Sequence, residues 1–148
     1  GLFYTISAVS MIIIRMISKH FMDTVPAIKT MTGAVACGIL CCLMLLAAPY
    51  GEPVFLASGI FYGLATGISL PLNQSVAVKN TPPERWGAAN ALFLLANDIG
   101  IGFASVIWGV INDSFGFQTS IVCVIVCLIA SYASAWIVYP ARDKRWRH

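Results

Sequence analysis

Asp98 is an acidic residue in the middle of a long apolar stretch, where carboxylates are rare. It follows Arg85 by 13 residues, which is about 20 Å along a helix and close to the middle of a membrane. A carboxylate at that depth is tolerated where it faces a bundle interior or water. Asp98 is therefore either a site for a proton or a substrate, or a packing carboxylate bonded to a neighbour such as Asn97.

The residues around Asp98 favour the packing interpretation. At helical steps of three or four residues they form a stripe of small side chains, while Phe93, Phe103 and Ile107 lie opposite and are expected to face lipid. Small side chains let a neighbouring helix approach closely. The members of this small-residue stripe are Gly87, Ala91, Asp98, Gly102, Ser105 and Gly109.

Two other groups of polar residues are candidates for contact with a substrate. Asn73 and Gln74 follow Pro71, which removes a backbone hydrogen bond from a helix and kinks it. A kinked helix with polar side chains suits a cavity wall or a gate, and capping of the helix end is the alternative. Tyr4 belongs to a second polar group near the N-terminus, which either lines a cavity or forms hydrogen bonds between helices.

Three glycines repeat at every fourth position between these two polar groups. They are Gly59, Gly63 and Gly67, and this spacing places them on one face of a helix. The pattern predicts a close contact between two helices rather than a ligand site.

The five cysteines and two histidines do not form a metal-binding pattern. The cysteines lie within apolar stretches and are expected to act as small apolar side chains, while His20 and His148 are interfacial or terminal. We therefore expect no metal site and no cofactor. The sequence has no P-loop or dinucleotide fingerprint and no nucleophile–base set, so we also expect that the protein is not an enzyme.

The composition excludes a soluble globular domain. Of the 148 residues, 59% are hydrophobic and only 10% are charged, whereas soluble domains carry about 25% charged residues. A membrane helix needs about 20 apolar residues, and five such stretches are separated by polar connections rich in proline and glycine. The chain is predicted to be an all-α polytopic membrane protein with five transmembrane helices, at about 1–18, 30–48, 54–78, 86–111 and 117–139, and a tail at 140–148.

The charges predict how these helices are oriented. All nine basic residues lie around the first and third connections or in the tail, while the second and fourth connections carry only Glu52 and Asp113. By the positive-inside rule, the N-terminus of this chain is outside and its C-terminus is cytoplasmic, in a plasma (inner) membrane. The basic tail is expected to contact anionic lipid headgroups. The nine are Arg15, Lys19, Lys29, Lys79, Arg85, Arg142, Lys144, Arg145 and Arg147.

An internal repeat links two of the connections. Lys19-x-x-x-Asp23-x-x-Pro26 matches Gly109-x-x-x-Asp113-x-x-Gly116 at an offset of 90 residues. Three helices separate the two motifs, so they lie on opposite faces of the membrane. A three-helix unit repeated with inverted topology is a transporter architecture, and it predicts one further helix before Gly1.

With these motifs the chain resembles the major facilitator superfamily. That family has twelve helices in two halves, with G-x-x-x-D-x-x-G loops after its second and eighth helices. The resemblance implies that the five stretches are helices eight to twelve, that Arg15 ends the eighth helix, and that Asp23 is the loop aspartate. Lys19 and Pro26 depart from the pattern because they replace the two glycines of the loop.

The most specific part of the resemblance lies around the third connection. Residues 82–93, followed by Asp98-Ile99-Gly100-Ile101-Gly102, are similar to the start of the eleventh helix in the drug- and sugar-efflux-like branches. The loop and gating residues that the resemblance assigns are Arg15, Asp23, Gly109, Asp113 and Gly116.

The resemblance implies secondary active transport of a small molecule by alternating access, with proton-coupled efflux as the expected form. Its expected partners are the missing N-terminal helices of the same transporter, a small-molecule substrate, H⁺ and membrane lipids, but no nucleic acid. A non-transporting membrane module, such as a scaffold or channel subunit, is the alternative. The identity of the substrate is not encoded in any of these motifs.

Overall fold

The computed structural model describes the backbone of residues 1–79 and 81–143, and the side chains of these residues except at 19–24, 50 and 138–143. Its architecture confirms the prediction of an all-helical chain with five long helices. They are α1 (Leu2–Thr24), α2 (Ala27–Leu46), α3 (Glu52–Lys79), α4 (Trp86–Phe115) and α5 (Phe117–Asp143), with short 3₁₀ turns at Ala48–Tyr50 and Pro83–Arg85.

Helix α1 extends beyond the end expected from hydropathy. Its apolar part is Leu2–Ser18, but the helical backbone continues to Thr24. The chain leaves the helix only at Val25, because the residue before a proline is disfavoured in the α region. Asp23 therefore belongs to the last turn of α1 and not to a loop, although its side chain lies outside the described residues.

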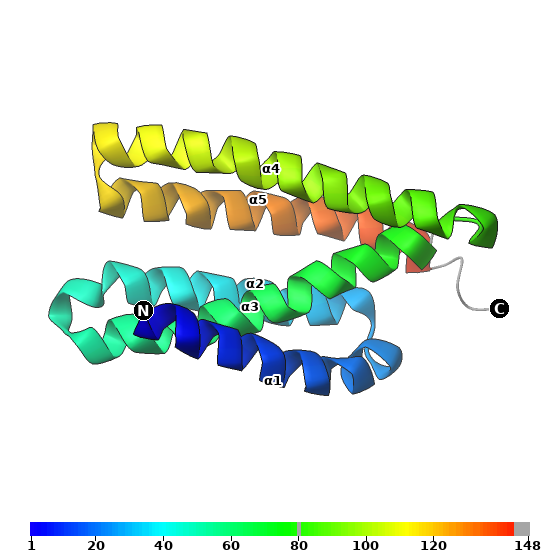
Figure 1. The fold of residues 1–148 in the computed structure, drawn as a ribbon, viewed down its shortest axis with the longest axis horizontal. Coiled ribbons are helices and arrows are strands. Elements are labelled where there is room, and N and C mark those ends of the chain that lie inside the picture. Colours follow the sequence, from blue (N-terminus) through cyan, green and yellow to red (C-terminus); the bar gives the residue numbers. More distant parts are fainter. Residues whose placement is uncertain (80, 144–148) are drawn as a thin grey trace.

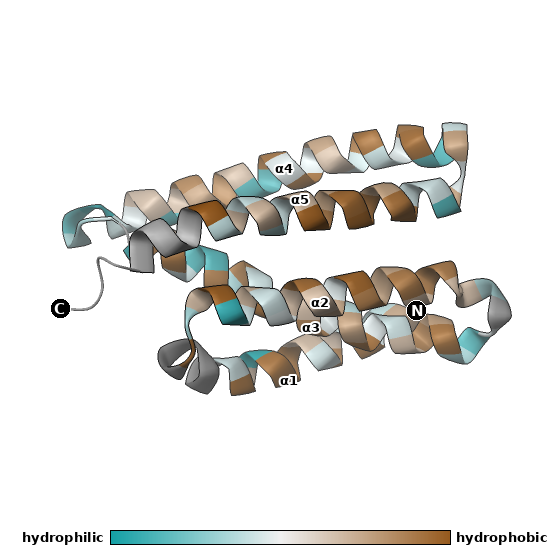
Figure 2. Ribbon diagram, turned by 180° about the vertical axis from the view of Figure 1, so that it is seen from behind, coloured by the Kyte–Doolittle hydropathy of each residue, from teal (hydrophilic) through white to brown (hydrophobic). Residues whose placement is uncertain are grey.

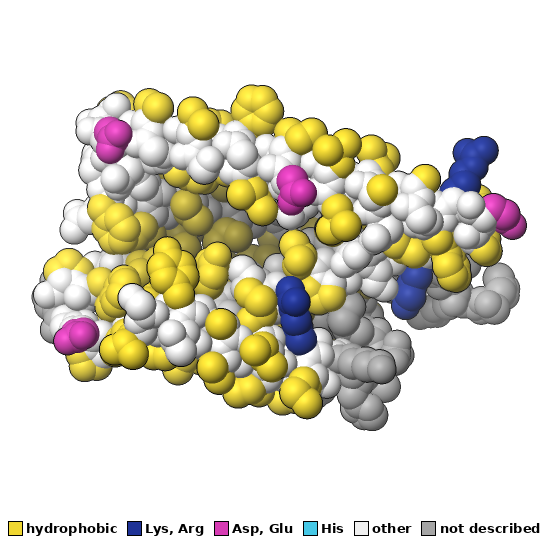
Figure 3. Space-filling view, in the orientation of Figure 1, with side chains coloured by type: hydrophobic (Ala, Val, Ile, Leu, Met, Phe, Trp, Pro, Cys, Tyr) yellow, Lys and Arg dark blue, Asp and Glu magenta, His cyan; other side chains and the backbone are white. Residues whose placement is uncertain are grey.

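Within the described residues, four helices are long and apolar enough to cross a membrane, and Leu2–Ser18 is a shorter apolar helix. The four are at Ala27–Leu46, Glu52–Lys79, Pro83–Phe115 and Phe117–Ile137. Hydrophobic residues predominate along the helices (Figure 2), and apolar side chains cover much of the face shown in the space-filling view of Figure 3. Leu92, Phe103, Val106 and Ile137 are among the large exposed ones. Such a surface suits contact with lipid, where apolar groups need no burial inside the protein.

The helices form two groups that are joined along α2 and α5 (Figure 1). Helices α1, α2 and α3 pack together in one group, and α4 and α5 form an antiparallel hairpin beside it. Helix α5 packs on α2, while the last part of α3 slants across to meet α4. Helix α4 is thereby left with only α5 and the end of α3 as its main neighbours.

The buried core lies where α2, α3 and α5 meet. Met31 and Val35 of α2 pack with Leu72 of α3 and Ala135 of α5. Next to this core, the hydroxyls of Thr32 and Tyr132 are hydrogen-bonded at 2.8 Å and tie α2 to α5. This core and hydrogen bond hold the hairpin against the three-helix group.

Candidate functional site

The glycines of α3 form a close contact with α1. A Cβ atom at Gly59 would lie 3.1 Å from the carbonyl oxygen of Phe3 and 3.1 Å from Oγ of Ser7. At Gly63, a Cβ would overlap the carbonyl oxygen of Ser7, and at Gly67 it would overlap Cγ2 of Ile14. The three glycines that the sequence places on one face therefore all meet the same partner helix.

Gln74 and Asn90 form the polar contact between α3 and α4. Nε2 of Gln74 donates a hydrogen bond of 2.5 Å to Oδ1 of Asn90, and both side chains are half-buried. Asn73 is also half-buried on α3. Gln74 was a candidate from the sequence, but Asn90 was not, because a pair 16 residues apart follows no helical period.

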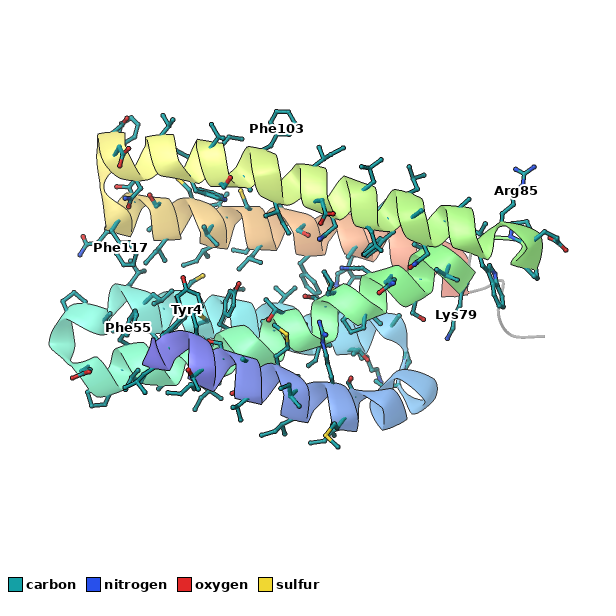
Figure 4. The ribbon with its side chains drawn as sticks, viewed as in Figure 1. Tyr4, Phe55, Lys79, Arg85, Phe103 and Phe117 are labelled. Carbon is teal, nitrogen blue, oxygen red and sulfur yellow. The ribbon has the colours of Figure 1, made fainter. Side chains whose placement is uncertain are left out.

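Helix α4 packs with a different face from the one that its small residues suggested. Its half-buried residues recur at steps of three, four or seven and face α5 and α3. Phe93, expected to face lipid, belongs to this packed face, whereas Phe103 is 70% exposed and points away from the bundle (Figure 4). The packed face consists of Ala89, Asn90, Phe93, Asn97, Ala104, Trp108 and Ile111.

The small-residue stripe of α4 is open in this structure. No atom lies within 4 Å of the position that a Cβ would take at Gly87, Gly102 or Gly109. Gly102 was expected to pack against a helix, but no neighbour in the described part of the chain reaches it. The stripe lies about 130° round the helix from the packed face, which explains why α5 and α3 do not cover it.

Asp98 lies on this open stripe and is exposed, whereas the adjacent Asn97 is half-buried on the packed face. Figure 3 shows that the molecule is hollowed between α4 and the three-helix group, with apolar side chains along the hollow. Tyr4 lies across the bundle on α1 and is 75% exposed. Tyr4 and Asp98 are therefore on different helices, and both are open to the outside of this chain.

Comparison with known proteins places the chain in a family. The sequence model described as Major Facilitator Superfamily matches residues 1–148. The chain belongs to the major facilitator superfamily. No curated protein and no solved structure matches it.

Membership of this superfamily agrees with the multi-pass membrane architecture and indicates transport of small molecules across a membrane. Of the loop residues implied by the resemblance, Asp23, Asp113 and Gly116 lie at the ends of helices, whereas Arg15 lies within α1, nine residues before its last residue, Thr24, and does not end that helix as the resemblance implied. Arg15 is exposed on α1, and Asp113 is exposed in the last turn of α4. Gly109 lies two turns before the end of α4, and Gly116 ends that helix with φ 83°, while its N–H donates to the carbonyl oxygen of Asn112 at 3.0 Å.

Cysteines and acidic residues do not gather into a metal centre in the described part of the chain. Among those residues, no group of three or more His, Cys, Asp or Glu side chains is placed to hold a metal ion. Cys41 and Cys42 are buried in α2, while Cys127 is exposed on α5. Their positions along apolar helices suit the packing role that the sequence predicts.

Proposed function

We propose that this chain is the C-terminal part of a proton-coupled secondary transporter that exports a small molecule by alternating access. The observation that carries the proposal is the open face of α4. It bears a carboxylate, Asp98, in the middle of a largely apolar helix, and the main neighbours of α4 within the chain leave this face uncovered. An intramembrane carboxylate on such a face is suited to binding a proton or a substrate.

The proposed translocation path lies beside this open face, between the helices described here and the N-terminal helices of the same transporter. Substrate would bind near the middle of the membrane, where two halves of a transporter meet. The hollow between α4 and the three-helix group supports this position (Figure 3). Tyr4 is a further candidate for contact with the substrate, because its side chain is exposed on α1, whereas Asn97 lies on the packed face of α4, turned away from this path.

The proposed orientation follows from the two ends of the bundle. Lys79 and Arg85 lie at the end where α3 joins α4, and Phe55 and Phe117 lie toward the other end (Figure 4). The positive-inside rule assigns the basic end to the cytoplasm. In a plasma membrane, protons that enter along their gradient would then bind Asp98 and drive the export of substrate.

The role of Asp98 is tested by two substitutions in the full-length protein. Asp98→Asn keeps the size and hydrogen-bonding capacity but removes the titratable proton. The proposal predicts that pH-driven export of a fluorescent dye or a labelled sugar from vesicles collapses in Asp98→Asn at an unchanged level of folded protein. Glu52→Gln, which likewise neutralises one carboxylate, at the exposed start of α3, is expected to retain export.

The alternative role for Asp98 is packing against helices outside this chain. In that case Asp98→Asn retains export. Asp98→Leu lowers the yield of folded protein, because the polar groups that bond the Asp98 carboxylate are left unsatisfied. Full folding and full export in Asp98→Leu would contradict both roles. A full-length protein that drives no flux in any of these assays would favour a scaffold or channel subunit.

A further inference from the structure

The hydrogen bond between Gln74 and Asn90 lies at the start of α4, where this helix meets α3. Asn90 is in the second turn of α4, and its Oδ1 accepts from Nε2 of Gln74 at 2.5 Å. Of the side-chain hydrogen bonds described above, only this one joins α4 to another helix. The rest of the packed face of α4 is largely apolar, and apolar contacts are not directional.

The residues that hold this bond are themselves fixed in place. Leu72 lies two residues before Gln74 and is buried in the core with Met31, Val35 and Ala135. After the connection, Nε1 of Trp86 donates a hydrogen bond of 2.9 Å to the carbonyl oxygen of Thr81. Leu72 thus fixes the end of α3 against the core, while the bond of Trp86 to Thr81 holds the start of α4 to the connection that joins it to α3.

Helical geometry relates Asn90 to the two polar residues at mid-membrane. Asn97 is seven residues further along and lies within about 20° of the direction of Asn90, whereas Asp98 is about 80° away and about 12 Å along the axis. The observed burial follows this geometry, because Asn97 is half-buried with Asn90 while Asp98 is exposed. A rotation of α4 by about one residue, or 100°, would turn Asn97 off the packed face.

We propose that Gln74 and Asn90 are positioning residues that set the rotation of α4 about its own axis and so hold Asp98 on the open face. This role rests on the proposed function, in which Asp98 binds the proton or substrate. Neither amide needs to touch the substrate. Their directional bond selects one rotation of the helix among several that the apolar contacts would accept.

The test compares the accessibility of positions 97 and 98 and does not depend on transport. In full-length protein freed of native cysteines, Asn97→Cys and Asp98→Cys are made separately and treated with a small, water-soluble methanethiosulfonate cation. With the amide pair intact, Asp98→Cys is expected to react faster than Asn97→Cys. With Gln74→Leu added, the ratio of the two rates is expected to fall about threefold or more, the effect of one interhelical hydrogen bond on a two-state equilibrium.

Two further variants separate positioning from a general structural role. Gln118→Leu makes the same change at an exposed glutamine of α5 and is expected to leave the ratio unchanged. The double exchange Gln74→Asn with Asn90→Gln swaps the two side chains and keeps a longer and a shorter amide facing each other. It is expected to restore the ratio of the two labelling rates. Asn90→Leu should reproduce the effect of Gln74→Leu from the other side of the bond.

The outcomes that overturn the proposal are distinct. Equal rates at the two positions with the amide pair intact would overturn it, and so would an unchanged ratio in Gln74→Leu and Asn90→Leu. Loss of folded protein in both of these variants would also overturn it, because the pair would then be needed for assembly rather than for rotation. Full export in Asp98→Asn would instead reject the coupling role while leaving the accessibility result intact.

Discussion

The carbonyl oxygen of Ser7 in α1 lies directly against Gly63 of α3, closer than a Cβ atom could approach it. A Cβ atom added at Gly63 would also lie 2.7 Å from Cβ of Ser10 and 3.1 Å from the backbone nitrogen of Met11. The two backbones are therefore in contact, which a glycine permits and any larger residue prevents. Because the obstructing atoms include backbone, they cannot move aside by a change of rotamer.

Gly63→Leu is expected to disrupt the packing of α1 on α3. Forcing extra atoms into a filled contact costs about 1–3 kcal/mol or more, and a leucine here meets backbone atoms on the opposite helix. The measurement is the yield of monodisperse protein in detergent and its thermal unfolding midpoint. Gly33→Leu is the matched control, because a Cβ at Gly33, also within a helix, meets no atom within 4 Å, and it is expected to lower neither quantity. Equal behaviour of the two variants would contradict the contact.

Tyr132→Phe is expected to weaken the attachment of α5 to α2. It removes the hydroxyl that is hydrogen-bonded to Oγ1 of Thr32 at 2.8 Å, and interhelical hydrogen bonds in membranes contribute about 0.6 kcal/mol on average, up to about 1.7 kcal/mol. A lower unfolding midpoint in denaturant is the expected result. Tyr4→Phe removes a hydroxyl from a side chain that is 75% exposed and should have no effect. A double-mutant cycle with Thr32→Val isolates the coupling, and a coupling energy of zero would show that the bond does not stabilise the protein.

Substitutions at two glycines are expected to have opposite effects on stability. Gly116 ends α4 with φ 83° and ψ 168°, a region that is essentially restricted to glycine and costs other residues about 1–3 kcal/mol, so Gly116→Ala should destabilise the hairpin. Gly100 lies within α4 and a Cβ there meets no atom within 4 Å, so Gly100→Ala should stabilise it by about 0.8–1.0 kcal/mol through helix propensity. Unfolding in denaturant measures both. Stabilisation by Gly116→Ala would be inconsistent with the observed backbone conformation.

Thiol labelling of intact cells tests the proposed orientation. Single cysteines at Gly51 and Ser114, in or beside the connections that carry no basic residue, are expected to react with a membrane-impermeant reagent added outside. A cysteine at Thr81, between Lys79 and Arg85, is expected to react only after the membrane is opened. The reverse pattern would show that the basic end of the bundle faces outward.

The sequence by itself determined the fold class and the order of the helices. Apolar stretches of membrane-spanning length bounded by proline, glycine and charge leave few alternatives, because a backbone in lipid must satisfy its own hydrogen bonds. Hydropathy marked the end of the apolar span at Ser18 but not the end of helix α1, because the backbone stays helical until Val25 and Pro26 force it to change. The spacing of Gly59, Gly63 and Gly67 likewise marked a contact face without indicating its partner.

Only the tertiary structure decided which helices share that contact and which face of α4 is covered. The glycines of α3 meet α1 because the chain returns beside it after α2. On α4, the pattern of small residues marked one stripe, but α5 and α3 pack on a different stripe, which includes Asn90 and its hydrogen bond with Gln74. Periodicity within one helix shows which similar residues share a face of that helix. Which neighbour that face meets depends on contacts between residues far apart in the chain.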